Sequence, residues 1–273
     1  MVFPLLLPEQ IGFPALANLL VFLFCFSQAY SQPLVLNLNA FAMVYSGQEK
    51  MHFSISWSGG IKIGDLYLSI ARKNTNSPLS INARVTDYGV FKFFYPVDDS
   101  FTTSLQGPLQ LPSRYEVNQL EGEMKVHRLT SYAQQRGEVV YQKNNQPAQT
   151  YTIAGPVYNE FSSFFITRAL QLIPNQEQIV PVFADKKRHK VVVKVFGVEP
   201  KETLFGTVST IKVLPKMHFK GLYDKDGDTI FWLTNDTCRI PVEISSKILI
   251  GSLVAELVEY AHPNCPLRPK KAP

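Results

Sequence analysis

Hydrophobic and polar residues alternate along most of the chain after residue 47, in short runs separated by Gly, Pro, Asn and Asp. A period of two places successive side chains on opposite faces of a β-strand. The pattern predicts strands at residues 48–58, 61–72, 79–86, 102–106, 111–119, 123–132, 136–142, 149–153, 179–184, 190–198 and 204–214, with a hairpin loop at 199–202. Many short strands at close spacing are typical of an all-β sheet or barrel.

The C-terminal stretch 217–260 predicts four further strands. Asp226-Gly227 is a two-residue hairpin signal, because a type I′ turn needs positive φ at both central positions. Centring the turn there pairs Gly221 with Trp232 across the hairpin. Two later turns lead into RIPVEISSK and SLVAELVEY, and the last strand alternates as expected of a half-buried strand.

One helix is predicted among the strands. Asn159 is a favourable N-cap residue, and Pro174 is expected to end the helix. The residues between them that recur at helical spacing are Phe161, Phe164, Phe165, Arg168, Ala169 and Leu172. We expect this helix to lie as a lid on the sheet, whereas the lead-in at 32–46 has no clear period. The sequence therefore predicts a mainly β fold, a curved antiparallel sheet or partly open β-barrel with one or two short helices.

Residues 1–31 are predicted to be a signal peptide. The run ALANLLVFLFCF has the length of a signal-peptide core and is too short to span a bilayer as a helix. Ala29-Tyr30-Ser31 offers small residues for cleavage before Gln32, although the segment carries Glu9 and no Lys or Arg. The alternative is that the segment is retained as an anchor. Cleavage would leave a single β domain at 32–260 and a Pro/Lys-rich tail at 261–273, exported to the periplasm.

The chain is basic, which favours anionic partners. Its 273 residues carry a formal charge of +5, and removal of Glu9 with residues 1–31 raises this to +6. Phospholipid head groups, lipopolysaccharide and acidic glycans are partners of this kind. No basic block interleaved with aromatic residues indicates nucleic-acid binding. The densest basic run, at 186–190, is expected in a solvated hairpin loop.

Two cysteines remain after residue 31, Cys238 and Cys265. An even count in an oxidising compartment is typical of a disulfide. If the chain reverses near residue 250, strand register places Cys238 opposite residues 260–264, within a few residues of Cys265. A bridge would fix the tail in place, and two independent thiols are the alternative.

Several segments carry a family resemblance. FKGLY, IFWLTND, RIPVEI, SKILIGS and AELVEY resemble the C-terminal pattern of the bacterial exported family called domain of unknown function 3108 (DUF3108), and GVFKFFYPVDDSF resembles its YPVDD block. The resemblance covers most of residues 45–260. It implies a mainly antiparallel β fold, a short helix in mid-chain and export to the periplasm. Cys238 and Cys265 depart from the usual family pattern.

Aromatic residues are the candidate ligand-binding residues. A curved sheet covered by a helix encloses a concavity, which could be lined by Trp57, Phe161, Phe165, Phe219, Tyr223 and Trp232. Ordinary core packing predicts the same residues. Asp98-Asp99 is a weaker candidate for acid–base chemistry, because neighbours on a strand point to opposite faces; in a turn, Asp98 would cap backbone N–H groups.

The sequence thus favours a non-enzymatic envelope protein that binds a lipid, a glycan or an envelope partner in the concavity. One alternative is a structural assembly scaffold without a small ligand, which would lack a ligand-sized pocket. Another is an envelope hydrolase that uses Asp98 or Asp99. No motif for a metal or a cofactor occurs, since the five histidines are scattered and phosphate-binding Gly-rich loops are absent.

Overall fold

The computed structural model describes residues 33–58, 60–74, 76–89, 96–216, 228–248 and 251–269. Contacts divide the chain into two units, Met1–Ser31 and Gln32–Pro273. The predicted signal peptide and its cleavage site lie outside the described residues.

The second unit is built around one antiparallel sheet of fourteen strands. The strands are β1 Gln48–Trp57, β2 Ile61–Arg72, β3 Leu79–Asp87, β4 Asp98–Gln106, β5 Leu111–Glu121, β6 Met124–Ala133, β7 Glu138–Lys143, β8 Gln149–Thr152, β9 Gln178–Ala184, β10 Lys187–Thr203, β11 Gly206–Lys216, β12 Thr229–Thr234, β13 Pro241–Lys247 and β14 Ser252–Ala261. Their order is β8-β7-β6-β5-β4-β3-β2-β1-β14-β13-β12-β11-β10-β9. Strand β1 therefore joins two meanders, because it pairs with both β2 and β14.

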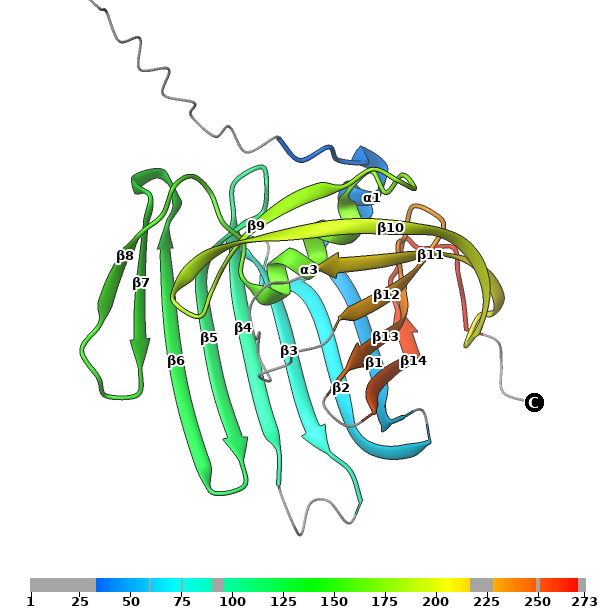
Figure 1. The fold of residues 1–273 in the computed structure, drawn as a ribbon, viewed down its shortest axis with the longest axis horizontal. Coiled ribbons are helices and arrows are strands. Elements are labelled where there is room, and N and C mark those ends of the chain that lie inside the picture. The colour runs from blue at the N-terminus through cyan, green and yellow to red at the C-terminus, as the bar shows by residue number, and fades with distance from the viewer. Residues whose placement is uncertain are drawn as a thin grey trace, which may run out of the picture. The chain divides into compact units, whose positions relative to one another are not determined.

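The sheet curls so that β9, β10 and β11 pass across the face formed by β3 to β6, with a helix between them (Figure 1). Tyr132 of β6 and Tyr151 of β8 contact Phe183 of β9 across this space, with ring centroids 6.3 and 5.7 Å apart. The inward side chains of both layers form one core. The predicted fold class, a curved and partly open antiparallel barrel with short helices, is confirmed.

The helix inside the curl is α3, Glu160–Ala169. Its N-cap is Asn159, as predicted: the Asn159 side chain accepts from Ser162 N at 2.8 Å, and Ser162 Oγ accepts from Asn159 N at 2.8 Å. The helix ends at Ala169, so the predicted extension to Leu172 and Pro174 is wrong. Asn37 N donates to Ala169 O, and Gln171 N donates to Val35 O, so a neighbouring segment takes the bonds that a further turn would need.

A second helix precedes the sheet. Helix α1, Leu38–Val44, is capped by Asn37, whose side chain accepts from Ala40 N at 3.0 Å. The lead-in showed no clear period because only Ala40 and Val44 are buried in this seven-residue helix. A 3₁₀ turn, η1 Gln134–Arg136, also lies between β6 and β7.

Strand β10 corrects two predicted loops. Residues 199–202 pair with residues 207–210 of β11, so the turn lies at residues 204–205 instead. In the described ladder, β9 pairs with β10 only as far as Val193. Pro200 lies beyond this point, on a free edge of β10, so its lack of an N–H costs no hydrogen bond to β9. Of the basic run, Lys186 lies in a turn, whereas Lys187 to Lys190 belong to β10.

The predicted register of Trp232 is also wrong. Trp232 pairs with Lys212 of β11 on one side and with Glu243 of β13 on the other, so it does not pair with Gly221. The hairpin signal Asp226-Gly227 lies outside the described residues. In β14 the alternation holds to Leu257 and then shifts, because a bulge opposite His52 and Phe53 makes Tyr260 the next buried residue.

A fully buried ion pair joins α3 to the sheet. The Arg168 guanidinium donates through Nη1 to Glu49 Oε2 at 2.8 Å and through Nη2 to Glu49 Oε1 at 2.7 Å. Arg168 Nε donates to the carbonyl of Arg239 at 2.9 Å, and Tyr260 Oη donates to Glu49 Oε1 at 3.2 Å. Arg168 and Glu49 are 0% and 1% exposed. One cation therefore connects the helix, β1, β14 and the turn before β13.

A disulfide lies beside this pair. Cys238 and Cys265 are bonded, with their Cα atoms 5.9 Å apart and a sequence separation of 27. The carbonyl of Cys238 also accepts from Arg168 Nη2 at 3.3 Å. Past β14, His262 Nδ1 accepts from the N–H groups of Asn264 and Cys265 at 3.1 Å each. The described part of the tail is thus bound to the core by a covalent bond and by hydrogen bonds.

We predict that Arg168→Met lowers the free energy of unfolding by about 3–5 kcal/mol, because it leaves Glu49 buried without a counter-charge. The double variant Glu49→Leu/Arg168→Met should recover most of this loss, since neither charge then remains buried. Urea unfolding followed by fluorescence measures both. A single variant that loses less than about 1 kcal/mol would contradict the assigned role.

We predict that Cys238→Ala/Cys265→Ala lowers the free energy of unfolding by about 3 kcal/mol, the value expected for a bridge that closes a loop of this length. Reducing agent should lower the stability of the wild-type protein to that of the double variant. It should leave the double variant unchanged, and a reductant effect on the variant would exclude this bridge as the cause.

Candidate functional site

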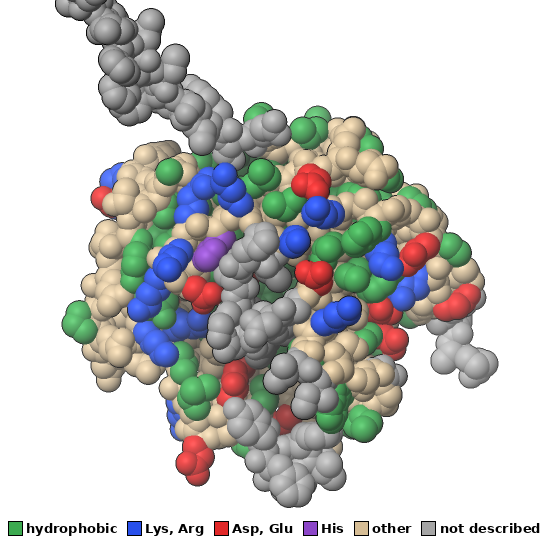
Figure 2. All heavy atoms as spheres, viewed as in Figure 1, with side chains coloured by type: hydrophobic (Ala, Val, Ile, Leu, Met, Phe, Trp, Pro, Cys, Tyr) green, Lys and Arg blue, Asp and Glu red, His purple; other side chains and the backbone are tan. Residues whose placement is uncertain are grey.

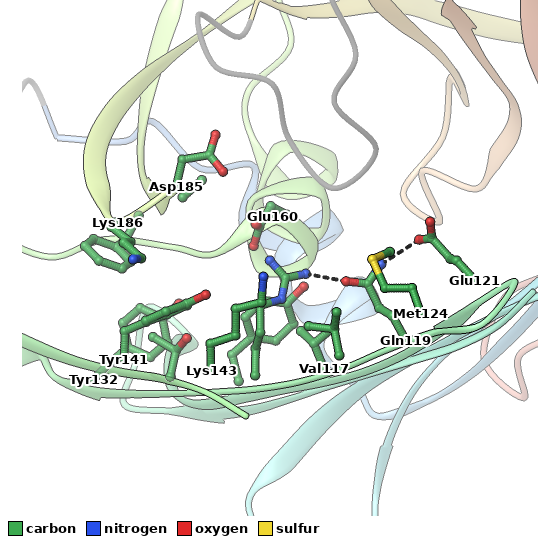
Figure 3. Close-up of a pocket in the computed structure, with 16 residues that line it drawn as sticks. Val117, Gln119, Glu121, Met124, Tyr132, Tyr141, Lys143, Glu160, Asp185 and Lys186 are labelled. Carbon is green, nitrogen blue, oxygen red and sulfur yellow. Dashed lines mark hydrogen bonds between the residues drawn. The ribbon is translucent and has the colours of Figure 1, made fainter. Parts of the chain in front are cut away.

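A groove of about 600 Å³ opens on the concave side of the sheet. Its floor is formed by β5, β6 and β7, and its other walls by the start of α3 and the turn between β9 and β10 (Figure 3). The floor residues are Tyr115, Val117, Gln119, Glu121, Met124, Val126, Arg128, Thr130, Tyr132, Tyr141 and Lys143, and the facing residues are Glu160, Phe183, Ala184, Asp185 and Lys186. The volume falls within the range of about 300–1,000 Å³ usual for small-molecule sites.

Strand register decides which residues reach the groove. Val117 lies opposite Arg128, and Arg128 lies opposite Lys143 on the next strand. Two residues further along the floor, Gln119 lies opposite Val126. Because inward positions recur every second residue, the floor carries aliphatic, aromatic and charged side chains next to one another. Figure 2 shows Lys and Arg side chains gathered on the side of this face where β6, β7 and the β9–β10 turn lie.

A hydrogen-bond network crosses the floor. Arg128 Nη2 donates to Gln119 Oε1 at 2.9 Å. The amide nitrogen of Gln119 donates to Glu121 Oε1 at 3.0 Å and to Asp99 Oδ2 at 3.3 Å. Asp99 also accepts from the N–H of Leu120 at 3.0 Å, which fixes the carboxylate from behind the groove. The network orients Arg128 without giving it a carboxylate partner.

Two acidic side chains in the groove hold protons more strongly than usual. Burial raises the pKa of Glu160 to about 7, the Asp185 charge adds to this, and the Arg128 charge opposes it. Burial, with the neighbouring Asp99 carboxylate, also raises the pKa of Glu121. Figure 3 shows Glu160 and Lys143 pointing into the groove from opposite sides. At neutral pH the negative charge of the groove is therefore smaller than its number of carboxyl groups suggests.

Of the sequence-predicted ligand-binding residues that the structure describes, Phe161 and Phe165 of α3 lie together. The Phe161 ring contacts Phe101 and Tyr115, at centroid distances of 5.0 and 6.5 Å, and so lies beside the groove. Phe165 is 0% exposed and belongs to the core. Ordinary packing accounts for Phe165, and Phe161 supports the groove wall.

Trp232 and Trp57 lie elsewhere. The Trp232 indole donates to Glu199 Oε1 at 2.5 Å, and Lys201 Nζ lies 4.4 Å from its ring. The adjacent residue Phe231 points the other way and contacts the α3 ring Phe164 at 4.9 Å. Trp57 is 41% exposed and is the last residue of β1. The remaining two predicted residues, Phe219 and Tyr223, lie outside the described residues.

Asp98 and Asp99 open β4 and face opposite sides of the sheet. Arg84 binds Asp98 through two hydrogen bonds of 2.8 and 2.9 Å, and this contact lowers the pKa of Asp98. Asp99 is 0% exposed and faces the groove network. The expectation that Asp98 caps backbone N–H groups is wrong, since Asp99 accepts the backbone N–H bond of Leu120. The two carboxylates do not face one substrate.

The central groove residues Arg128, Lys143, Tyr141 and Glu160 were not predicted from the sequence. In MKVHRLTSY both sets of alternate positions mix polar and apolar residues, so the pattern does not say which face is inward. Only the pairing of β6 with β5 and β7 shows which side chains of β6 face inward.

Within the described ranges, no helix is long and apolar enough to cross a bilayer, and no three His, Cys, Asp or Glu side chains group together as metal ligands would.

Comparison with known proteins gives a fold and a family. No curated protein matches the chain. A crystal structure of a beta-barrel-like protein of domain of unknown function DUF1849 from Brucella abortus is similar, with a TM-score of 0.54 and 11% identity. The similarity covers 84% of this chain and 99% of that one, and at this identity it concerns the fold alone. The family described as "Protein of unknown function (DUF3108)" matches residues 52–258, which is well over half of the sequence, and the chain therefore belongs to the DUF3108 family.

Proposed function

We propose that this protein is exported to the bacterial periplasm, where it binds a lipid or a similar amphiphile in the concave groove. The groove itself carries the proposal. Its volume of about 600 Å³ is enough for a ligand of that size. A purely structural scaffold would need no such space, so the groove favours a binding protein.

The walls of the groove favour an amphiphile over a purely polar glycan. Met124 is 51% exposed and Val126 is half-buried, and burying their apolar surface against hydrocarbon would contribute about 25 cal/mol per Å². Arg128 and Lys143 lie directly beside this surface. A ligand with an apolar part and a polar part would satisfy both regions. A glycan alone would leave the aliphatic wall without a matching partner.

Export is supported by two observations. The first 31 residues have the pattern of a secretory signal, and Cys238 is bonded to Cys265. Disulfides persist in oxidising compartments such as the periplasm and are rare in the cytosol. The hydrolase alternative has less support, because Asp98 is ion-paired on the convex side and Asp99 is fixed within the groove network.

We predict that Val126→Trp abolishes binding of octyl glucoside by filling the groove, with at least a tenfold loss of affinity in isothermal titration calorimetry. The matched control is Lys125→Trp, one residue away and on the opposite face of β6. This control should bind like the wild-type protein. Native mass spectrometry of both proteins, purified from periplasm without detergent, should show a co-purifying ligand only in the control. Equal binding by the two variants would exclude the groove as the binding site.

We predict that Glu160→Gln changes how stability depends on pH. The pKa of Glu160 is raised to about 7 in the folded protein, against 4.5 ordinarily, so the folded state holds the proton more strongly than the unfolded state. The wild-type protein should therefore lose stability relative to the variant as the pH rises from about 4.5 to 7, by at most about 3 kcal/mol. Above pH 7 the difference should stay constant. Urea unfolding at pH 5 and pH 8 measures the free energy of unfolding of both proteins. If wild type and variant differ by the same amount at the two pH values, the assignment is contradicted.

A further inference from the structure

Two cations face each other across the floor of the groove. Arg128 of β6 and Lys143 of β7 are direct cross-strand partners, and both side chains line the groove. Like charges directly opposite one another on adjacent strands are destabilising. This arrangement requires a compensating group near both side chains.

Neither cation forms a close ion pair within the described part of the chain, although the charge of Arg128 acts on the Glu160 and Glu121 carboxyl groups. Other cations are paired there, for example Arg84 with Asp98 and Lys201 with Glu243, but no described ion pair includes Arg128 or Lys143. Arg128 Nε is buried and makes no hydrogen bond. A buried donor that stays unbonded costs about 1–3 kcal/mol, and more on a charged group, so the hydrogen bonds of Arg128 are incomplete.

The groups around the pair leave room for a negative charge. Gln119 takes one N–H of Arg128 as a neutral acceptor, and its own amide holds Glu121 on the far side. Glu160 faces the cations from α3, and its carboxyl group is protonated over much of the range below neutral pH because burial raises its pKa to about 7. On the remaining wall, Asp185 and Lys186 have opposite charges and largely cancel.

We propose that Arg128 and Lys143 bind the phosphate or carboxylate head group of an anionic amphiphile, whose apolar part lies along Met124 and Val126. This inference rests on the proposed function and names its ligand class. The guanidinium fork matches the oxygens of a phosphate or a carboxylate, and the lysine adds a second positive charge. A bound anion would neutralise the like-charge pair.

Three probes separate the head group of the ligand from its alkyl chain: octyl phosphate, octyl glucoside and inorganic phosphate. The two octyl ligands are used below their critical micelle concentrations. With the protein expressed as the full chain, we expect octyl phosphate to bind at least ten times more tightly than octyl glucoside. Lys143→Gln should remove most of this preference. Lys125→Gln, which removes the same charge from the other face of β6, should bind all three probes like the wild-type protein.

Arg128→Lys provides a second variant that keeps the charge and loses the planar fork, and it should retain part of the preference. Circular dichroism and urea unfolding establish that each variant folds. Equal binding of the two octyl ligands by the wild-type protein, or an unchanged preference in Lys143→Gln, would overturn the anion subsite and leave the lipid groove intact.

Inorganic phosphate distinguishes the source of the anion. If phosphate alone binds, with loss of binding in Lys143→Gln, while neither octyl ligand binds, the anion subsite stands and the proposed lipid function fails. If octyl phosphate binds at least ten times more tightly than phosphate, the apolar wall contributes, and the ligand is an anionic amphiphile.

Discussion

The ion pair between Arg168 and Glu49 is the contact on which the arrangement of the other parts depends. A charged guanidinium in a core is tolerated only when its donors are satisfied, and here a carboxylate and two backbone carbonyls satisfy them. These partners come from β1 and from the turn before β13, which are far apart in sequence. The position of α3 is thus specified by electrostatics as well as by its buried aromatic rings. A helix held only by apolar contacts could rotate or slide with little loss.

The fixed helix makes the groove. Because Arg168 near its C-terminal end is held in place, the N-terminal turn of α3 with Glu160 stands over β5 to β7. Asn159 supports this end, since its side-chain nitrogen donates to Thr103 of β4 at 2.8 Å. The groove beneath the N-terminal turn of α3 therefore exists because contacts at both ends of the helix fix its position. Charged and apolar side chains share this space because inward positions on neighbouring strands are set by register alone.

Much of the fold could be predicted from the sequence, because alternation and turn residues are local signals. The strands around residues 48–72 and 241–261 were read within a few residues of their bounds, and Asn159 was identified as a cap from its own side-chain chemistry. The wrong predictions concern features that are determined by contacts with distant segments. These features are the end of α3 at Ala169, the continuation of β10 through Pro200, and the strand partners of Trp232. The groove was missed for the same reason. Arg128 and Lys143 are fifteen residues apart in the sequence, and nothing in either local pattern says that they meet.

The strand order has a consequence for how the protein reaches this state. Along the sheet every neighbouring pair is also consecutive in the chain, apart from β1 with β14. Closing that pairing brings together segments about two hundred residues apart, whereas each hairpin closes a short loop. During folding, β1 therefore presents an unpaired edge until the last strand arrives, and such an edge is a template for aggregation. Long-range pairings of this kind slow folding, so the edge of β1 stays uncovered until the C-terminal strand has docked.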